Sequence, residues 1–235
     1  MRFSTEESLD ISIIMPCLNE INTVGLCVDE ALSYIRSKGL RGEVIVADNG
    51  STDGSAVLAK QHGAYVVNVS PIGYGNAIIN GISYSGGKVI VIGDCDTTYD
   101  FSDLDSFYEP LSEGAFDVVI GDRFSGGIEK GAMPLSHKLG VRFLSACGRN
   151  RFKTDVRDFH SGLRGLTRNA ALKIECTHGG MEFATEMIAC AAMSGLKIGQ
   201  TPIKLRKCQY ERKSKLKTIR DGIRHLSYIY NTKRP

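Results

Sequence analysis

The sequence predicts one α/β domain in which helices cover both faces of a mostly parallel central sheet. Three continuous apolar runs, at residues 11–15, 44–47 and 89–92, each end in a turn that carries acidic side chains. Such runs, bounded by turn residues, are typical of buried parallel strands. Helix patterns separate them, and repeated strand–helix–strand units predict a parallel sheet. The 235 residues, 42% of them hydrophobic, are enough to bury a full core.

The first half of the chain alternates strands with helices. The expected helices cover residues 20–37, 55–61, 74–84 and 102–112, and two further strands are expected at 65–69 and 117–120. Glycine, asparagine and aspartate residues punctuate these segments, as is typical of the loops between regular elements.

The second half is less regular. A glycine-rich loop covers 121–131, and after it we expect a helix over 134–149, a short polar segment around Asp158, a helix over 181–193 and a strand over 198–205. No linker or internal repeat divides the chain. Residues 10–120, 121–205 and a basic tail at 206–235 are therefore expected to form a single domain over residues 1–235.

Charge is distributed unevenly along the chain. The formal net charge is +3, but residues 204–235 hold eleven Lys or Arg and two acids, whereas the other residues have a net charge of −6. A basic segment on an acidic body indicates an anionic partner such as phosphate, an anionic membrane surface or nucleic acid.

Residues 214–230 of this tail have the pattern of an amphipathic helix. The apolar residues recur at spacings of three and four, and cations are interleaved with them; the apolar set is Leu216, Ile219, Ile223, Leu226 and Tyr230. Such a helix can lie at a membrane surface with its cations toward lipid phosphates. Alternatively, the apolar stripe packs on the body and the cations are only solvated.

Several classes of site and location are not expected. The seven cysteines form no Cys-x-x-Cys pair, and none of the five histidines has zinc-ligand spacing to a cysteine. No apolar run approaches the length of a membrane span, and residues 1–10 contain no signal-peptide-like segment. Aromatic and basic residues are not interleaved as in nucleic-acid-binding surfaces. We therefore expect a reduced, cytoplasmic protein without a nucleic-acid partner.

The three acid-bearing turns form the candidate site, because open α/β sheets bind ligands at the carboxyl ends of their strands. Asp94 and Asp96 flank one residue and offer the hard oxygen ligands that Mg²⁺ or Mn²⁺ prefers. Asp48 could bind a base or ribose, whereas Asp53 is expected to cap the next helix. Glu20 could be a first-turn helix acid. This arrangement suits a divalent cation and a nucleotide diphosphate.

A series of motifs, in this order, resembles a known family. The motifs are Pro16-Cys17-Leu18-Asn19-Glu20, Asp48-Asn49-Gly50-Ser51-Thr52-Asp53-Gly54, Asp94-Cys95-Asp96, Gly121-Asp122-Arg123-Phe124, the stretches 158–164 and 181–187, and Ser214-Lys215-Leu216. They are similar to those of the inverting family 2 glycosyltransferases with the GT-A fold. The dolichyl-phosphate mannose synthase group and its bacterial polyprenyl-phosphate relatives resemble the chain more closely.

The resemblance implies a role for each matching residue. A UDP- or GDP-linked sugar would bind to residues 10–120 and the acceptor to residues 121–205. The residues implied at the base, ribose, diphosphate and metal are Pro16, Leu18, Glu20, Val46, Asp48, Asp94, Cys95, Asp96 and Thr98, the last as a further metal ligand. Arg123 and Lys215 would contact the donor or acceptor phosphate. The chain departs from the family at Leu18, where an aromatic residue is common, and at Asn49, where a second acid is common.

The acceptor decides which further side chains are needed. A phosphate acceptor is already an anion, and it requires cations that desolvate and align it; Arg123, Arg164 and Lys215 are the candidates. A hydroxyl acceptor requires a carboxylate base, for which Asp158 and Glu186 are the candidates. Glu182 shares a helical face with Glu186, so at least one of the two is expected in the cleft.

The favoured hypothesis is a metal-dependent inverting transferase that acts on a polyprenyl phosphate, as a peripheral protein on the inner face of the membrane. A soluble tailoring glycosyltransferase with a hydroxyl acceptor is one alternative, and a non-catalytic membrane-surface binding protein is another. A dinucleotide-dependent oxidoreductase is disfavoured because its third fingerprint glycine is replaced by Ile78.

Overall fold

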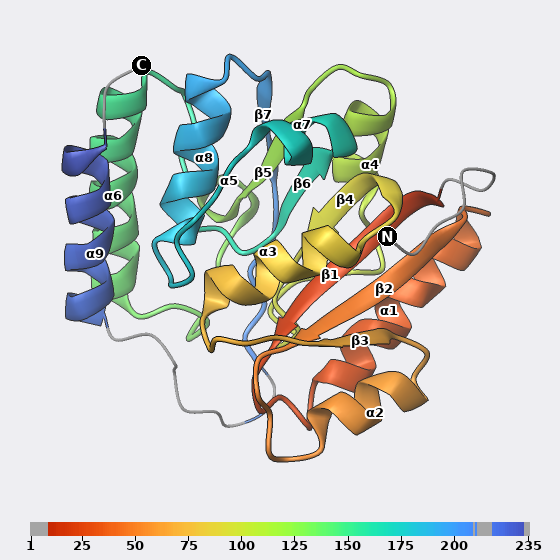
Figure 1. Cartoon of the computed structure of the whole chain (residues 1–235). Coiled ribbons are helices and arrows are strands. Elements are labelled where there is room, and N and C mark those ends of the chain that lie inside the picture. The colour runs from red at the N-terminus through yellow and green to blue at the C-terminus, as the bar shows by residue number, and fades with distance from the viewer. Residues whose placement is uncertain (1–8, 209, 211–217, 233–235) are drawn as a thin grey trace.

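The computed structural model describes residues 9–208, 210 and 218–232 (Figure 1). Its centre is a seven-stranded sheet with the order β3-β2-β1-β4-β6-β5-β7. The strands are β1 (Leu9–Cys17), β2 (Gly42–Asp48), β3 (Tyr65–Asn68), β4 (Gly87–Ile92), β5 (Val118–Asp122), β6 (Arg164–Thr167) and β7 (Ile198–Pro202). Strand β6 runs antiparallel to both neighbours, and every other pair is parallel. The predicted fold class is confirmed, and strands from both halves of the chain share the sheet.

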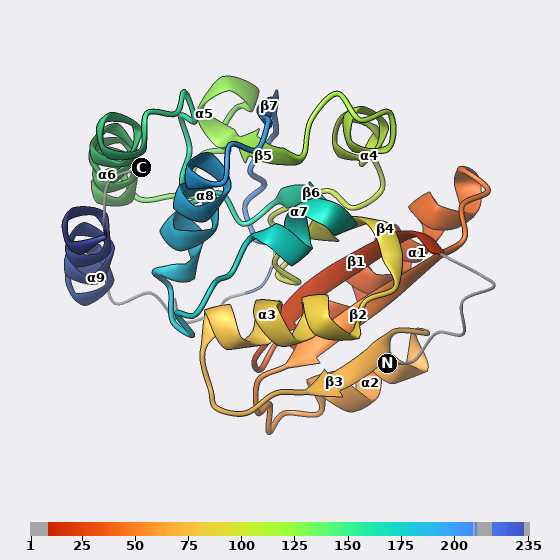
Figure 2. The ribbon, with the colours of Figure 1, turned by 45° about the horizontal axis from the view of Figure 1, so that its top comes forward.

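Helices cover both faces of this sheet (Figures 1 and 2). They are α1 (Val24–Ser37), α2 (Ser55–Gln61), α3 (Tyr74–Tyr84), α4 (Asp105–Ser112), α5 (Arg123–Gly126), α6 (Leu135–Phe152), α7 (Arg168–Lys173), α8 (Phe183–Met193) and α9 (Thr218–Asn231). The helices predicted from residues 20 and 102 begin later, at Val24 and Asp105, because turns precede them.

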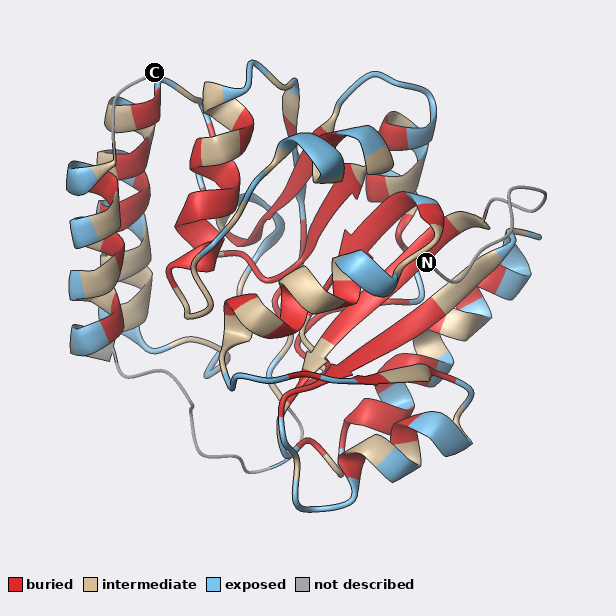
Figure 3. Ribbon diagram, in the orientation of Figure 1, coloured by how far each residue is buried: buried red, intermediate tan, exposed pale blue. Residues whose placement is uncertain are grey.

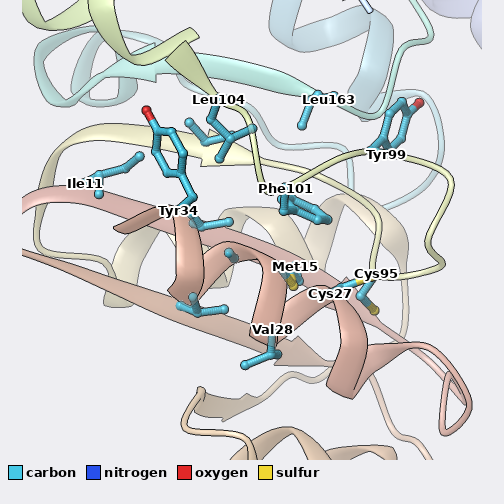
Figure 4. Packing of buried hydrophobic residues seen from close by; sticks show 14 of the residues in the cluster. Ile11, Met15, Cys27, Val28, Tyr34, Cys95, Tyr99, Phe101, Leu104 and Leu163 are labelled. Atoms are coloured by element: carbon cyan, nitrogen blue, oxygen red, sulfur yellow. The ribbon is translucent and has the colours of Figure 1, made fainter. Parts of the chain in front are cut away.

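Two apolar cores separate the sheet from its helices, and the strand residues alternate between them. Ile13 and Met15 of β1 belong to the core beneath α1 and α4, whereas Ile14 belongs to the core beneath α3 and α8. The same alternation recurs in β2 and β4, which explains why these strands are apolar at every position. Figure 3 shows β1, β2 and β4 mostly buried, and Figure 4 shows side chains of the first core, including Val28 and Tyr34 of α1.

Strand β6 and helix α7 are elements that the sequence pattern did not reveal. Arg164–Thr167 is short and begins with a charged residue, so it lacks the apolar run of the other strands. Gly165 packs closely under α4, where an added Cβ would lie 2.7 Å from a methyl carbon of Leu111. Thr167 caps α7 by accepting a hydrogen bond from the N–H of Ala170 at 3.1 Å. A threonine at this position is a common N-cap residue, so the start of α7 could have been predicted from the sequence.

Helix α9 confirms a helix in the tail but buries a different face from the one predicted. Its buried side chains are Asp221, His225 and Ile229, whereas Ile223 and Tyr230 are 62% and 66% exposed. Residues 214–217 of the predicted helix lie outside the described residues. The alternative in which the predicted stripe packs on the body is therefore wrong for Ile223 and Tyr230. The helix lies beside α6 (Figures 1 and 2).

Replacing Gly126 with alanine should destabilise the protein. An added Cβ would lie 2.3 Å from main-chain N and O atoms of Ile203, which no side-chain rotation can relieve. We expect the free energy of unfolding, measured in urea, to fall by about 1–3 kcal/mol, as is typical of overpacking. Gly140→Ala in α6 is the control: nothing lies within 4 Å of its added Cβ, and it should stabilise the helix by about 0.5–1 kcal/mol. Equal stability of Gly126→Ala and wild type would contradict the packing of α5 on β7.

Candidate active site

The three acid-bearing turns meet at one edge because β1 lies between β2 and β4. Cys17 at the end of β1 pairs with Asp48 at the end of β2. On the other side, Ile14 of β1 pairs with Ile92 at the end of β4. Neighbouring strands are about 4.8 Å apart, so the ends of β2 and β4 are separated by about 10 Å. The structure thus brings Asp48 and the Asp94–Asp96 turn to the same edge.

Hydrogen bonds join the first turn to the second. Asn19 Oδ1 accepts a hydrogen bond from the N–H of Thr52 at 2.8 Å. Asp53 accepts from the N–H of Ile21 at 3.0 Å and from the N–H of Ser55, the first residue of α2, at 2.9 Å. Gly54 is the N-cap residue of α2, so Asp53 lies one position before the cap predicted for it. Its hydrogen bonds fix the two turns relative to each other.

Asp48 offers one free acceptor atom at this edge. Its Oδ2 accepts from the N–H of Gly50 (3.3 Å) and of Ser51 (3.1 Å). Its Oδ1 is buried and has no hydrogen-bond partner among the described residues. A buried acceptor without a donor is costly, so this oxygen is suited to a ligand hydroxyl or N–H group.

The hydrogen bonds of Asn49 require an amide at this position, where the family resemblance leads one to expect an acid. Its Nδ2 donates to the carbonyl oxygens of Val69 and Pro71, both at 3.4 Å, and its Oδ1 accepts from the N–H of Gly73 at 2.6 Å. A carboxylate cannot donate to the two carbonyls. Asn49 thus fixes the loop between β3 and α3.

The third turn presents one carboxylate and buries the other. Asp94 is half-buried, and Tyr74 and Gly162 lie beside it; burial and the Asp94 charge raise the pKa of Tyr74 well above its ordinary value. Asp96 is 3% exposed, and its Oδ1 accepts from the N–H of Thr98 at 3.0 Å and from the Thr98 hydroxyl. Thr98 therefore supports Asp96 directly.

Cys95, between these acids, points away from the edge. Its thiol donates to the carbonyl oxygen of Pro16 at 3.3 Å. Hydrogen bonding with Cys17, together with burial, raises the pKa of Cys95 well above its ordinary value. Cys95 thus joins the third turn to the first as a neutral thiol, and only its main chain is available to a diphosphate.

The acid pair fits a hard divalent cation. Among the described residues there is no group of three or more His, Cys, Asp or Glu side chains that could hold a metal ion. Asp94 and Asp96 could therefore supply only part of a coordination shell. Mg²⁺ and Mn²⁺ commonly bind through one or two carboxylates, with substrate phosphates and water completing the shell.

A buried ion pair lies beside the acids. Arg123 Nε and Nη2 donate to the two carboxylate oxygens of Asp158 at 2.7 and 2.8 Å, and Asp158 is fully buried. Burial opposes the charge of Arg123, but Tyr99, Asp158 and Asp94 raise its pKa above the ordinary value. Arg123 therefore remains a cation near Asp94, held in orientation by Asp158.

Comparison with known proteins identifies the family. The sequence model for "Glycosyl transferase family 2" matches residues 12–174. This chain belongs to glycosyl transferase family 2. The low-salt glycan biosynthesis hexosyltransferase Agl6 of Haloferax volcanii is 34% identical over 93% of this chain and 52% of its own length. The chain thus spans about half of that relative.

Other family 2 relatives match over more of their length. Glycosyltransferase AglJ of Haloferax volcanii is 33% identical over 90% of this chain and 68% of its own length. The dolichyl-phosphate hexose transferase of the same organism is 30% identical, and the match covers 84% of this chain and 83% of that protein.

Solved structures share the fold. The glucosyl-3-phosphoglycerate synthase of Mycobacterium tuberculosis, in complex with phosphoglyceric acid, has a TM-score of 0.76 and 23% identity; the match covers 96% of this chain and 81% of that chain. The same enzyme in complex with Mn²⁺, UDP-glucose and phosphoglyceric acid has a TM-score of 0.75. These similarities confirm the predicted GT-A-type fold.

Within this family 2 site, Arg164 forms hydrogen bonds with main-chain carbonyl groups. Its guanidinium donates to the carbonyl oxygens of Ser161 (2.7 Å), Ala184 (2.8 Å) and Phe159 (2.8 Å). The residue is 2% exposed, and burial lowers its pKa. Arg164 thus holds residues 159–163 against α8, and its contact with an acceptor phosphate stays a prediction.

Glu186 anchors the loop before α8. Its carboxylate accepts hydrogen bonds from the N–H of Thr177 (3.1 Å) and of His178 (2.9 Å), and it pairs with His178 Nδ1 at 2.7 Å. The carbonyl oxygen of Gly179 in this loop accepts from the N–H of Asn76 at the start of α3. Glu186 therefore positions the loop before α8, and its role as a base stays a prediction.

Glu182 faces α9. One of its oxygens pairs with Arg224, and the other, Oε2, is buried without a hydrogen-bond partner among the described residues. Glu182 is 6% exposed and, together with His178 and Arg224, lines a cavity beside α9. The expectation that one of the two glutamates lies in the acceptor cleft stays a prediction.

The remaining predicted site residues differ in the solvent exposure of their side chains. Pro16 and Leu18 are half-buried at the edge, and Glu20 is buried. The Val46 side chain belongs entirely to the core beneath α1, so only its main chain can reach a ligand. Lys215 lies outside the described residues.

Two histidines pack against each other behind the site. The rings of His160 and His225 are 4.4 Å apart in an edge-to-face arrangement, and Thr185 Oγ1 lies 2.8 Å from His225 Nδ1. Burial lowers the pKa of His225 to about 4 and that of His160 well below its ordinary value. Both are therefore neutral structural residues at pH 7.

Replacing Asp158 with alanine should destabilise the protein strongly. The change leaves the buried Arg123 guanidinium without its counter-ion, which typically costs about 3–5 kcal/mol. Urea unfolding measures the loss. Asp155→Ala, at an exposed aspartate three positions earlier, is the control and should change stability by less than about 0.5 kcal/mol. Similar stabilities of the two variants would show that the ion pair does not form.

Stability should fall as the pH drops from about 6.5 to 4. His225, with a folded-state pKa of about 4, stays neutral, whereas in the unfolded chain it takes up a proton near its ordinary pKa of about 6.5. The unfolded state therefore binds more protons in this window, which costs the folded state up to about 3 kcal/mol at its acidic end. Urea unfolding across this range measures the slope. His225→Gln should flatten this slope, and an unchanged slope in that variant would refute the assignment.

Proposed function

We propose that the protein transfers a hexose from a UDP- or GDP-linked donor to the phosphate of a polyprenyl (dolichyl-type) phosphate, with inversion at the anomeric carbon. The observation that carries the proposal is the convergence of Asp48, Asp94 and Asp96 at one edge beside the buried Arg123–Asp158 pair. Family membership and the dolichyl-phosphate hexose transferase relative agree with it.

On the donor side, the free Oδ1 of Asp48 would accept a hydrogen bond from the ribose or base. Asp94 and Asp96 would hold Mg²⁺ or Mn²⁺ together with the diphosphate. When bound, the ion neutralises charge that develops on the diphosphate leaving group. The structurally similar glucosyl-3-phosphoglycerate synthase binds Mn²⁺ and UDP-glucose, which supports the same donor class here.

On the acceptor side, the engaged carboxylates favour a phosphate. Both candidate bases are occupied: Asp158 by Arg123, and Glu186 by the loop at Thr177 and His178. A hydroxyl nucleophile requires a base, whereas a phosphate is already ionised at pH 7. This argument favours a lipid-phosphate acceptor over the hydroxyl acceptor of a tailoring enzyme.

The bond changes are those of a direct displacement. A phosphate oxygen of the acceptor forms a bond to the anomeric carbon while the bond from that carbon to the nucleoside diphosphate breaks, and the diphosphate leaves as the anion. Arg123, oriented by Asp158, would stabilise the phosphate charge during this exchange.

Contact with a membrane surface is part of the proposal. No helix in the described part of the chain is long and apolar enough to cross a bilayer. Helix α9 leaves Ile223 and Tyr230 exposed, with the exposed Arg220 on the same helix. Apolar side chains mixed with cations are typical of helices that lie at a membrane surface. A peripheral location on the inner face of the membrane would bring the enzyme to its acceptor.

Sugar transfer to dolichyl phosphate, followed by mass spectrometry of the lipid product, tests the function. With UDP- or GDP-hexose and Mn²⁺, we expect a hexosyl-phosphate lipid. Asp94→Ala should lower the rate by about 10²-fold or more, because it removes charge stabilisation at the leaving group. Glu113→Ala, an exposed acid after α4, is the control and should retain full activity.

Parallel assays separate the alternatives. Transfer to a hydroxyl acceptor, with no product on dolichyl phosphate, would favour the soluble tailoring enzyme. A membrane-binding protein without catalysis would bind vesicles equally well with and without Asp94 and would form no product with any donor.

A further inference from the structure

A cavity of about 750 Å³ lies outside the acid edge, between α5, α6 and β7. Three arginines line it, namely Arg142 and Arg149 from α6 and Arg157 from the segment before Asp158, together with Phe124 and Gln200. Neither the acids of the three turns nor Arg123 and Asp158 line this cavity. It is therefore a separate feature from the proposed donor site.

The three arginines have no carboxylate partner among the described residues. The Arg142 guanidinium lies over the Phe124 ring, 4.8 Å from its centroid, and this contact leaves its N–H groups free. By contrast, Arg41, Arg123, Arg206 and Arg224 each form an ion pair. Three guanidinium groups around one cavity outnumber the carboxylates in its lining, and an anion between them would reduce their mutual repulsion.

Two carboxylates also line the cavity, but they do not cancel this charge. Asp122 is engaged by the N–H groups of Phe124 (2.9 Å) and Ser125 (3.2 Å) and by the Ser125 hydroxyl. Asp155 is exposed and forms no ion pair among the described residues. The lining thus keeps an excess of positive charge.

The cavity wall is fixed by the main chain. Gln200 Oε1 accepts from the N–H of Arg157 at 2.6 Å, and Gln200 Nε2 donates to the carbonyl oxygen of Asp155 at 3.1 Å. Arg142 and Arg149 project from α6, and Gln200 of β7 holds the main chain at Arg157. Preorganised cations lose less entropy when they bind an anion.

We propose that this cavity is a second phosphate-binding site, separate from the site at Asp94 and Asp96. Arginine is suited to phosphate because its planar fork donates two parallel hydrogen bonds to phosphate oxygens. The ligand class is a phosphate mono- or diester, either free in solution or as the headgroup of a lipid.

The adjoining surface of α6 favours the lipid source. Leu135, Leu139 and Phe143 recur every four residues and are 72%, 60% and 59% exposed. They lie on the same helix as Arg142 and Arg149, so an apolar chain lying along α6 would place its phosphate at the cavity. This site would hold a phospholipid or the acceptor lipid at a distance from the reacting phosphate.

Two binding measurements test the site and distinguish the sources of phosphate. Isothermal titration with inorganic pyrophosphate in EDTA reports on free phosphate, because the proposed donor site lacks its metal there. Co-sedimentation with phosphatidylglycerol vesicles, against phosphatidylcholine vesicles, reports on a lipid headgroup. The cavity variant is Arg142→Gln/Arg149→Gln/Arg157→Gln. The charge-matched control is Arg36→Gln/Lys60→Gln/Lys173→Gln, at exposed cations on α1, α2 and α7.

We expect the cavity variant to bind one of the two probes about tenfold or more weakly than the control variant. Loss of pyrophosphate binding would assign a free phosphate ligand, and loss confined to phosphatidylglycerol vesicles would assign a lipid. Equal binding by the cavity and control variants, or no binding by the wild type to either probe, would overturn the proposal.

A donor-binding measurement makes the result independent of the proposed function. Thermal stabilisation by UDP or GDP with Mn²⁺ should be the same in wild type and the cavity variant. Arg142→Gln and Arg157→Gln, single changes at exposed positions, provide folded proteins for the same titrations if the triple variant does not fold. Each should weaken binding of the responsive probe by a measurable factor, and no effect from either would count against the site.

Discussion

The position of β1 between β2 and β4 is the constraint on which the site depends. Parallel neighbours send their carboxyl ends to the same edge, so the turns after these strands must meet there. Strand β6 extends this constraint to the second half of the chain. Because β6 is antiparallel to both β4 and β5, β5 runs parallel to β4, and Arg123 leaves its carboxyl end at the acid edge. A strand too short to be recognised in the sequence thus brings the cation to the acids.

Most of the buried charge near this edge maintains structure. Arg164 donates hydrogen bonds to three carbonyl oxygens, Glu186 accepts hydrogen bonds from a loop, and Asp158 forms an ion pair with Arg123. Among the described residues, Oδ1 of Asp48 is a buried acceptor at this edge that has no hydrogen-bond partner. Because both candidate bases, Asp158 and Glu186, are engaged, the site favours an acceptor nucleophile that is already ionised.

The sequence predicted the strands that set the edge, because apolar runs that end in acid turns have few other interpretations. It placed Asp48, Asp94 and Asp96 together for the same reason. It could not assign partners to Arg164 or Glu186, because those partners are main-chain groups whose positions depend on tertiary packing. The buried face of α9 was also out of reach: His225 is buried through its contacts with Thr185 and His160, and these override the apolar stripe.

The distribution of charge bears on how an anionic acceptor could approach. The edge carries Asp48, Asp94 and Asp96, and its cation Arg123 is already paired with Asp158, so before a metal binds the edge repels a phosphate. Screening limits attraction between exposed charges to about 8–10 Å at physiological ionic strength. An initial hold on a phosphate therefore has to come from cations that are both unpaired and outside the edge. Among the described residues, the arginine cavity beside α6 meets both conditions, and the exposed Leu135, Leu139 and Phe143 give it an apolar surface on which a lipid chain can lie.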